Sequence, residues 1–240
     1  MENDIYLELV TQYPIKFDNL IIRQPTFREI KDFGINNYYN LLYPFMLHVG
    51  VFDIPEEDVE KVNFFSDILM GSQEYMLNIV IALRFFTNAS DIGISEDGKS
   101  LICVKDETET IIDDTNFNTF SDIILKMNDK EKIEVEKPPK NMSEKQRDVW
   151  QKLHEGRERE KQKNVTHLYD VLNICEFGGN YHIPIETMLN WSLWRIMNCY
   201  HSIINRSSYN DGVKFCLVGG DVKNINGNNH WTKKLMVGKK

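Results

Sequence analysis

Long apolar runs are missing from this 240-residue sequence, although hydrophobic residues make up 42% of it. The longest strongly apolar stretch, residues 78–86, contains Arg84 and is far shorter than the roughly 20 residues that cross a bilayer. The first residues include Glu2 and Asp4, whereas a secretory signal peptide begins with basic residues and continues into an apolar segment. We therefore expect a soluble globular protein that is not exported and does not span a membrane.

Cysteine, proline and glycine are also scarce, with 4, 7 and 13 residues respectively. So little glycine and proline excludes a collagen-like chain. The cysteines are Cys103, Cys175, Cys199 and Cys216, and the closest two are 17 positions apart, so no pair has the C-x-x-C spacing of a zinc site. In a chain without an export signal we expect all four thiols to be reduced, as in a cytoplasm.

The sequence contains none of the short motifs that mark common catalytic and nucleotide-binding sites. It has no G-x-x-x-x-G-K-[ST] loop, G-x-G-x-x-G loop, G-x-S-x-G elbow or H-E-x-x-H helix. The histidines lack metal-ligand spacing, although His182 and His201 could approach each other with Cys199 or Glu186 nearby, which would favour an enzyme. We expect no catalytic, cofactor-binding or metal-binding residues, and so not an enzyme; convergence of these histidines is the alternative.

Charge is distributed unevenly along the chain. The formal net charge is −8, but residues 1–127 carry −13 and residues 128–240 carry +5. The basic residues of 144–163 alternate with acids, as in Glu155 and Arg159, and each acid cancels part of the gain from releasing the counterions of a nucleic acid. This pattern predicts an exposed helix with its own ion pairs and no nucleic-acid partner.

Residues 1–127 are predicted to form an α+β domain with small antiparallel hairpins and helices. Asp18-Asn19 separates two β-prone runs, and Thr26 with Glu29 has the spacing of a capping box that starts a helix ending before Gly34. Apolar periodicity and turn residues predict the other elements. The expected elements are hairpins at 13–17/20–23 and 92–94/101–104, a short strand at 110–112, and helices at 26–33, 36–48, 66–86 and 116–128.

Residues 128–143 are rich in lysine and glutamate and contain Pro138-Pro139, which predicts a charged linker; a solvated loop within one domain is the alternative. Residues 144–240 are predicted to be a mainly helical domain with a polar tail. Its helices are expected at 143–163, 165–177 and 184–204 and from Tyr209 to a stop at Gly219-Gly220, followed by the tail at 224–240.

The four tryptophans are the candidate partner-binding residues, because aromatic side chains dominate the energetics of protein interfaces. Trp150 is an apolar anchor on the charged helix, and Trp231 lies in the polar tail, where it either docks back on the body or meets a partner. Trp191 and Trp194 are three positions apart on one predicted helix. They could form a groove for a partner, but packing in the core of their own domain is the favoured interpretation.

Three stretches of the chain resemble one known family. The first is Ile21-Ile-Arg-Gln-Pro-Thr-Phe-Arg-Glu-Ile with Phe33-Gly-Ile-Asn-Asn-Tyr-Tyr, the second is Asn116-Phe-Asn-Thr-Phe-Ser-Asp-Ile-Ile-Leu-Lys-Met-Asn, and the third is His167-Leu-Tyr-Asp-Val-Leu-Asn with Ile185-Glu-Thr-Met-Leu-Asn-Trp-Ser-Leu-Trp-Arg-Ile-Met. Together they are similar to the tail assembly chaperones of tailed bacteriophages that infect low-GC Gram-positive bacteria.

The resemblance implies a protein of viral tail assembly that acts in the host cytoplasm and needs no cofactor. Such chaperones bind the tape-measure protein, keep its apolar helices from aggregating and help to recruit tail tube subunits. They are usually absent from the virion, and many occur as a short form and a longer frameshifted form, whose junction would fall in residues 128–143 here. Self-association is a further expectation. The alternative is a structural tail component, a completion or baseplate adaptor protein that is retained in the virion.

Overall fold

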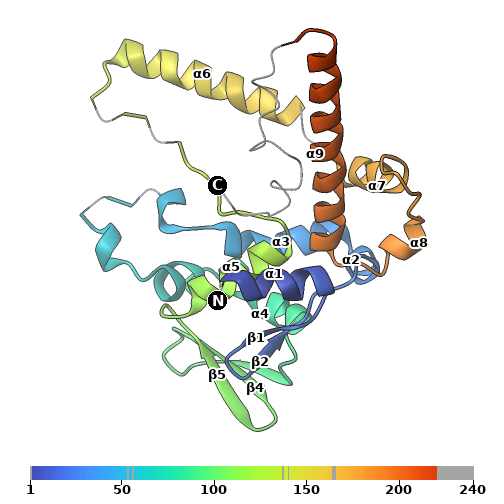
Figure 1. Cartoon of the computed structure of the whole chain (residues 1–240). Helices are drawn as coiled ribbons and strands as arrows, with labels where there is room; N and C mark the ends of the chain where they lie inside the picture. The colour runs from blue at the N-terminus through green and yellow to red at the C-terminus, as the bar shows by residue number, and fades with distance from the viewer. Residues whose placement is uncertain are drawn as a thin grey trace.

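The computed structural model describes residues 2–220 apart from positions 53, 56, 137, 140, 164 and 165. Within this part, the N-terminal half combines helices with two small antiparallel sheets, and the C-terminal half is mostly helical, as Figure 1 shows. The predicted fold class is therefore confirmed.

The N-terminal half contains six of the labelled helices and strands before its second sheet, joined by short turns. In chain order these are α1 (Glu2–Thr11), β1 (Ile15–Phe17), β2 (Leu20–Ile22), α2 (Phe27–Phe33), α3 (Ile35–Met46) and, after two 3-10 turns (Val49–Val51, Val59–Lys61) and a π-helix (Phe64–Leu69), α4 (Gln73–Phe86). The second sheet, β3 (Asp91–Ile94), β4 (Leu101–Lys105) and β5 (Thr108–Ile112), and then α5 (Phe117–Met127) complete this half. The C-terminal half follows with α6 (Glu144–Lys163), α7 (Leu168–Phe177), α8 (Ile185–Met188) and α9 (Leu193–Leu217).

The first hairpin and the helix after it form as their residues predict. Asp18 in the turn between β1 and β2 has φ = +51°, a left-handed conformation that aspartate tolerates. At the start of α2 the Thr26 hydroxyl accepts a hydrogen bond from the Glu29 amide at 3.3 Å, and the Glu29 carboxylate accepts one from the Thr26 amide at 2.8 Å. Gly34, with φ = +95°, ends the helix. The predicted capping box and helix end are both confirmed.

The predicted continuous helix over residues 66–86 is wrong, because the π-helix stops and α4 starts separately after a turn. A Cβ on Gly71 would lie 2.5 Å from the carbonyl oxygen of Asp67, so the chain turns at a position where only glycine fits. The hydroxyl of Ser72 then accepts a hydrogen bond from the Tyr75 amide and caps α4. A new helix therefore starts where apolar periodicity alone predicted the continuation of an old one.

An aromatic core lies between α3, the π-helix and α5. The predicted second hairpin, short strand and closing helix are all present. The rings of Phe45 and Phe117 are stacked with centroids 5.8 Å apart, and Phe65 lies 4.6 Å from Phe117. All three side chains are at most 2% exposed. Beside them the hydroxyl of Tyr38 donates a hydrogen bond to the side-chain oxygen of Asn128, which ties α3 to the residue that ends α5.

The predicted helix over residues 184–204 is also wrong, because a turn separates α8 from α9. The residues of this turn instead bind the start of α2. The Phe27 amide donates to the carbonyl oxygen of Trp191 at 2.7 Å, and the Arg28 amide donates to that of Leu189 at 2.9 Å. The first amides of a helix have no acceptor within their own helix, so the turn supplies the acceptors that α2 lacks.

The ends of the other C-terminal helices differ from their predicted positions. α9 continues without a break to Leu217, so the predicted separate helix starting at Tyr209 is wrong. Residues 205–208 lie inside α9, where asparagine and serine cost only about 0.5 kcal/mol each. α7 begins at Leu168 and not near position 165, because the Asp170 carboxylate accepts a hydrogen bond from the His167 amide and makes His167 the cap.

Two apolar clusters join the N-terminal and C-terminal halves. Leu193 and Trp194 of α9 belong to the main core of the N-terminal half. The second cluster contains Phe27 of α2 together with Val171, Cys175, Met188 and Ile196. Shared apolar packing therefore crosses the predicted boundary between residues 1–127 and 144–240, and the division of the chain into two domains stays a prediction.

Residues 128–143, the predicted linker, form neither helix nor strand at the positions that the structure describes. Their first part is attached to the N-terminal half. The Ile133 amide donates to the carbonyl oxygen of Met46 at 2.8 Å, and His48 Nε2 lies 2.8 Å from the carbonyl oxygen of Ile133. Beyond this point the segment rises away from the body and leads to α6 (Figure 1).

Candidate functional site

α6 is the most exposed element of the described chain, and local signals explain why it is helical. The Ser143 hydroxyl accepts a hydrogen bond from the Gln146 amide at 3.4 Å, and the Gln146 side chain accepts one from the Ser143 amide at 2.9 Å. The predicted pair of Glu155 and Arg159 is present at 3.7 Å, one turn apart. None of residues 144–160 is buried, so this helix depends on its cap and ion pairs more than on packing.

One side of α6 is apolar. Val149 and Leu153 are 57% and 58% exposed, and they lie beside Trp150 and beside Met142 just before the helix. Val149 and Leu153 are four positions apart and Trp150 and Leu153 are three apart, so the three side chains lie on one side of the helix, and Met142 precedes Val149 by seven positions, or about two turns. With Lys145 and Gln146 at its edge, this face lines an open depression of about 390 Å³. We call Met142, Val149, Trp150 and Leu153 the α6 apolar face.

Contacts from the preceding segment hold α6 in place. Glu136 lies 3.3 Å from His154 Nδ1 and 3.4 Å from Arg157 Nη1, so one carboxylate pairs with two residues of the helix. The His154 ring stacks on Trp150, with centroids 5.0 Å apart and an angle of 5° between the ring planes. Trp150 is therefore held at one edge of the α6 apolar face while Val149 and Leu153 stay open to solvent.

The four candidate tryptophans do not form one site. Trp150 lies on α6, and Trp231 lies outside the described residues. Trp194 is 3% exposed in the main core, and Trp191 is half-buried against the second cluster. The Arg195 guanidinium lies 4.5 Å from the centre of the Trp191 ring. Since Trp191 and Trp194 pack into different clusters, the structure places Trp150 alone among the described tryptophans on an open apolar face, and partner binding by any of the four stays a prediction.

The histidines that would have favoured an enzyme pair with separate carboxylates. His201 Nε2 lies 3.0 Å from Asp129 Oδ2, and this hydrogen bond raises the pKa of His201 against the opposing effect of partial burial. His182 lies 3.4 Å from the Glu176 carboxylate, beside the ring of Phe177. The two histidines therefore belong to different contacts, and within the described ranges no group of three or more histidine, cysteine or acidic side chains could hold a metal ion.

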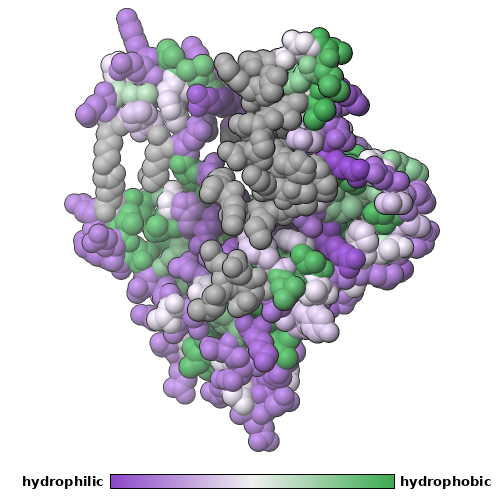
Figure 2. All heavy atoms as spheres, in the orientation of Figure 1, coloured by the Kyte–Doolittle hydropathy of each residue, from purple (hydrophilic) through white to green (hydrophobic). Residues whose placement is uncertain are grey.

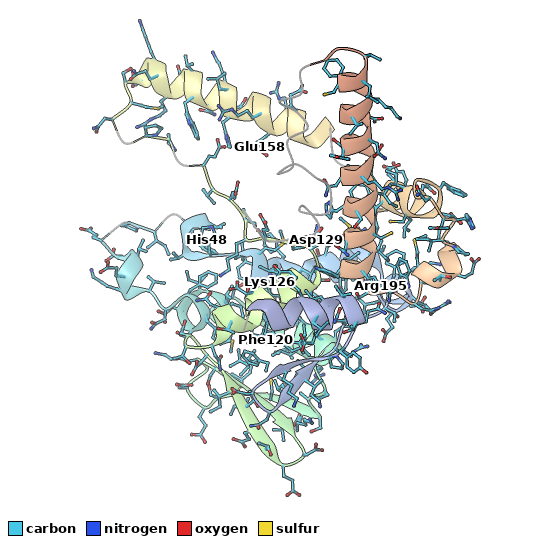
Figure 3. All side chains as sticks on the ribbon, viewed as in Figure 1. His48, Phe120, Lys126, Asp129, Glu158 and Arg195 are labelled. Atoms are coloured by element: carbon cyan, nitrogen blue, oxygen red, sulfur yellow. The ribbon has the colours of Figure 1, made fainter. Side chains whose placement is uncertain are left out.

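A cavity of about 540 Å³ surrounds the pair of His201 and Asp129. Trp194 of α9 and Tyr6 of α1 form part of its wall. Its other lining residues come from α5 and from the start of the predicted linker, and all but Leu125 are charged: Asp122, Leu125, Lys126, Lys130, Glu131 and Lys132. Figure 3 shows Lys126 and Asp129 near the lower end of α9, where the two halves meet. Positive and negative side chains alternate around this cavity, so it favours neither sign of ligand.

The structure brings together two cysteines whose contact the sequence did not predict. Cys175 of α7 is fully buried and its sulfur lies 3.5 Å from the carbonyl oxygen of Ile196, while Cys199, three positions after Ile196 on α9, packs against the same second cluster. No disulfide joins them. Their separation of 24 positions matches no known motif. Both cysteines, however, fall on apolar faces of predicted helices, and this was the signal in the sequence that could have indicated their contact. Val149 and Met142 were missed for a similar reason, because a sparse apolar face is hard to recognise in so charged a segment.

Comparison with known proteins gives no relative for this chain: no family model, no curated protein and no solved structure matches it. Of the helices that the structure describes, none is both long enough and apolar enough to cross a membrane.

Proposed function

We propose that this chain is a bacteriophage tail assembly chaperone that binds the tape-measure protein in the host cytoplasm and assists the assembly of tail tube subunits. The observation that carries the proposal is the α6 apolar face, which presents Val149 and Leu153 to solvent on a helix in which no side chain of residues 144–160 is buried. The proposed activity is non-covalent, so the chain acts as a binding protein and not as an enzyme.

An exposed helix with one apolar face suits a partner that is itself made of amphipathic helices. The apolar side of such a partner helix can pack against the α6 apolar face. Val149 and Leu153 are about one helical turn apart, which matches the repeat of apolar residues along the partner helix. α6 has 20 residues and is therefore about 30 Å long, which matches five or six turns of a partner. The alternating charges around the face can pair with the charged flanks of that helix.

The size of the α6 apolar face indicates weak binding by each copy of the chain. Full burial of an aliphatic side chain stabilises a complex by about 1.5–3 kcal/mol, whereas association costs about 4–15 kcal/mol in lost freedom of motion. The four side chains of this face therefore roughly offset that cost. Several copies bound along one long partner would cover its apolar helices and still leave easily, which is what an assembly chaperone requires.

The test is co-expression of the chain with the tape-measure protein of the same phage, using variants on opposite sides of α6. Leu153→Glu places a charge in the α6 apolar face, and Gln151→Glu places the same charge on the exposed opposite side. We expect Leu153→Glu to reduce co-purification and the soluble fraction of the tape-measure protein about tenfold, a loss of about 1.4 kcal/mol, and Gln151→Glu to leave both unchanged. Circular dichroism checks that both variants keep the helix content of the wild type.

Equal capture by Leu153→Glu and by the wild type would contradict binding through α6. A second measurement addresses the alternative role. Mass spectrometry of purified virions should not detect the chain if it acts only during assembly, whereas a fixed number of copies per particle would support a structural tail component.

A further inference from the structure

α7 and α9 bring two thiols together at the centre of their interface. Val171 and Cys175 are one turn apart on the buried side of α7, and Ile196 and Cys199 are three apart on α9. The Cys175 sulfur lies 3.5 Å from the carbonyl oxygen of Ile196, and Cys199 packs against the same second cluster. Two thiols that the packing of two helices keeps in one cluster can approach each other to form a disulfide.

The two thiols differ in their access to solvent. Cys175 is fully buried, whereas Cys199 is half-buried and forms part of the wall of a cavity of about 330 Å³. The Gly178-Gly179 turn after α7 forms one side of this cavity, and Ser202 and Arg206 of α9 form the other. A small polar molecule can therefore reach Cys199 from solvent, while Cys175 has no exposed surface.

The surroundings of the pair favour a thiolate on Cys199. The neighbouring Cys175 thiol lowers the pKa of Cys199, and the positive charge of Arg195, one turn earlier on α9, adds to this effect. Arg195 is itself held by its stacking on Trp191. The contact with Cys199 and burial raise the pKa of Cys175, which keeps that thiol protonated.

We propose that Cys199 and Cys175 are a peroxide-reactive dithiol pair, in which hydrogen peroxide oxidises Cys199 from the cavity and Cys175 then joins it in a disulfide between α7 and α9. The pair thereby acts as a redox-sensitive modification site. It is independent of the α6 apolar face, which lies on a different helix.

The chemistry balances with peroxide as the oxidant. The Cys199 thiolate attacks one oxygen of hydrogen peroxide, the O–O bond breaks, and the departing hydroxide takes up a proton, which leaves a sulfenic acid on Cys199 and one water. The Cys175 sulfur then attacks the Cys199 sulfur, the S–O bond breaks, and the hydroxide leaves with the Cys175 proton as a second water. Two thiols are oxidised to one disulfide, and one peroxide is reduced to two waters.

The test is oxidation of the reduced full-length protein with stoichiometric hydrogen peroxide. We expect the protein to lose the mass of two hydrogens and peptide mapping without reductant to join the peptides that contain Cys175 and Cys199. Cys103→Ser and Cys216→Ser should give the same product. Cys103 is the internal reference, because burial in the N-terminal core raises its pKa to about 11. Cys199 should react about tenfold faster than Cys103, or more.

Single variants separate the two steps. Cys175→Ala is expected to stop at the sulfenic acid of Cys199, which dimedone traps as a stable adduct, and Cys199→Ser is expected to form no intramolecular disulfide. Oxidation that begins at Cys103 or Cys216, a disulfide between two chains as the main product, or wild-type protein that accumulates the dimedone adduct without closing the disulfide would each overturn the proposal. Thermal unfolding before and after oxidation checks that the modified protein stays folded.

Discussion

The start of the predicted linker is held by two side chains from distant parts of the sequence. Tyr38 of α3 donates a hydrogen bond to Asn128, and the next residue, Asp129, pairs with His201 of α9 at 3.0 Å. Neither contact follows from a motif, because the partners are 90 and 72 positions apart. Both contacts are nevertheless testable by single substitutions.

Tyr38→Phe removes a hydroxyl from the core without changing its packing. Tyr38 is 1% exposed and Asn128 is 2% exposed, so the side-chain oxygen of Asn128 loses its donor away from water. We expect the free energy of unfolding to fall by about 1–3 kcal/mol. Chemical denaturation measures this change, and Tyr43→Phe, at a side chain that is 44% exposed, should change stability by less than about 0.5 kcal/mol. Equal effects of the two substitutions would show that the buried hydrogen bond does not stabilise the protein.

The pair of His201 and Asp129 predicts a pH dependence with a definite sign. The hydrogen bond to Asp129 raises the pKa of His201 in the folded state above the value of about 6.5 in the unfolded chain. The stabilisation is therefore complete below pH 6.5 and is lost as the pH rises through the folded-state pKa. We expect the difference in stability between wild type and His201→Gln to shrink as the pH increases above 6.5. Denaturation over this pH range and NMR titration of the His201 ring test the prediction, and a difference that grows with pH would contradict it.

At the scale of elements, the ends of α2 followed from neighbouring residues, whereas the turn between α8 and α9 depends on distant contacts. Thr26, Glu29 and Gly34 define both ends of α2 through bonds within nine positions, so the pattern was sufficient. The turn between α8 and α9 exists because its carbonyl groups bind the amides of Phe27 and Arg28. Those partners lie more than 160 positions away, so the spacing of apolar residues around the turn carries no information about them.

Gly71→Ala tests the interruption before α4. The new Cβ would lie 2.5 Å from the backbone oxygen of Asp67, which cannot move aside as a flexible side chain could. We expect a loss of about 1–3 kcal/mol in the free energy of unfolding. The matched control is Gly156→Ala on α6, where an added Cβ meets no atom within 4 Å and alanine should favour the helix by up to about 1 kcal/mol. Destabilisation by the control alone would contradict this account of Gly71.

The candidate site was predictable only in part for a related reason. The charged helix, its ion pair and the aromatic anchor Trp150 followed from residue types along the chain. Whether an apolar side chain is covered depends on what packs against it. Trp191 and Trp194 are three positions apart in one stretch of the sequence, yet Trp194 is 3% exposed in the main core and Trp191 is half-buried against the second cluster.

At the scale of the whole molecule, α9 connects the two halves. Its first turn packs into the main core through Trp194, and its other contacts hold α7 and the second cluster. The opposite charges of residues 1–127 and 128–240 favour the same association at low salt. The halves should therefore unfold together, although their sequences differ in composition.

Trp194→Ala removes the largest α9 side chain of the main core. We expect a loss of about 3–5 kcal/mol, with a single unfolding transition at a lower denaturant concentration. Trp191→Ala, at a half-buried position, should cost less. Denaturation followed by far-ultraviolet circular dichroism and by tryptophan fluorescence tests this. Two separate transitions in the wild type would show that the halves are independent domains.

The hydrogen bonds between α2 and the turn before α9 also have a consequence for the order of synthesis. When residues 1–127 have left the ribosome, the acceptors for the Phe27 and Arg28 amides have not yet been translated. A product that terminated within residues 128–143 would keep those two amides hydrated and would expose Phe27, which is 4% exposed in the full chain. A truncated product would thus differ from the full one in the folded N-terminal half as well as in length. The start of its α2 would be uncovered and free to bind another molecule.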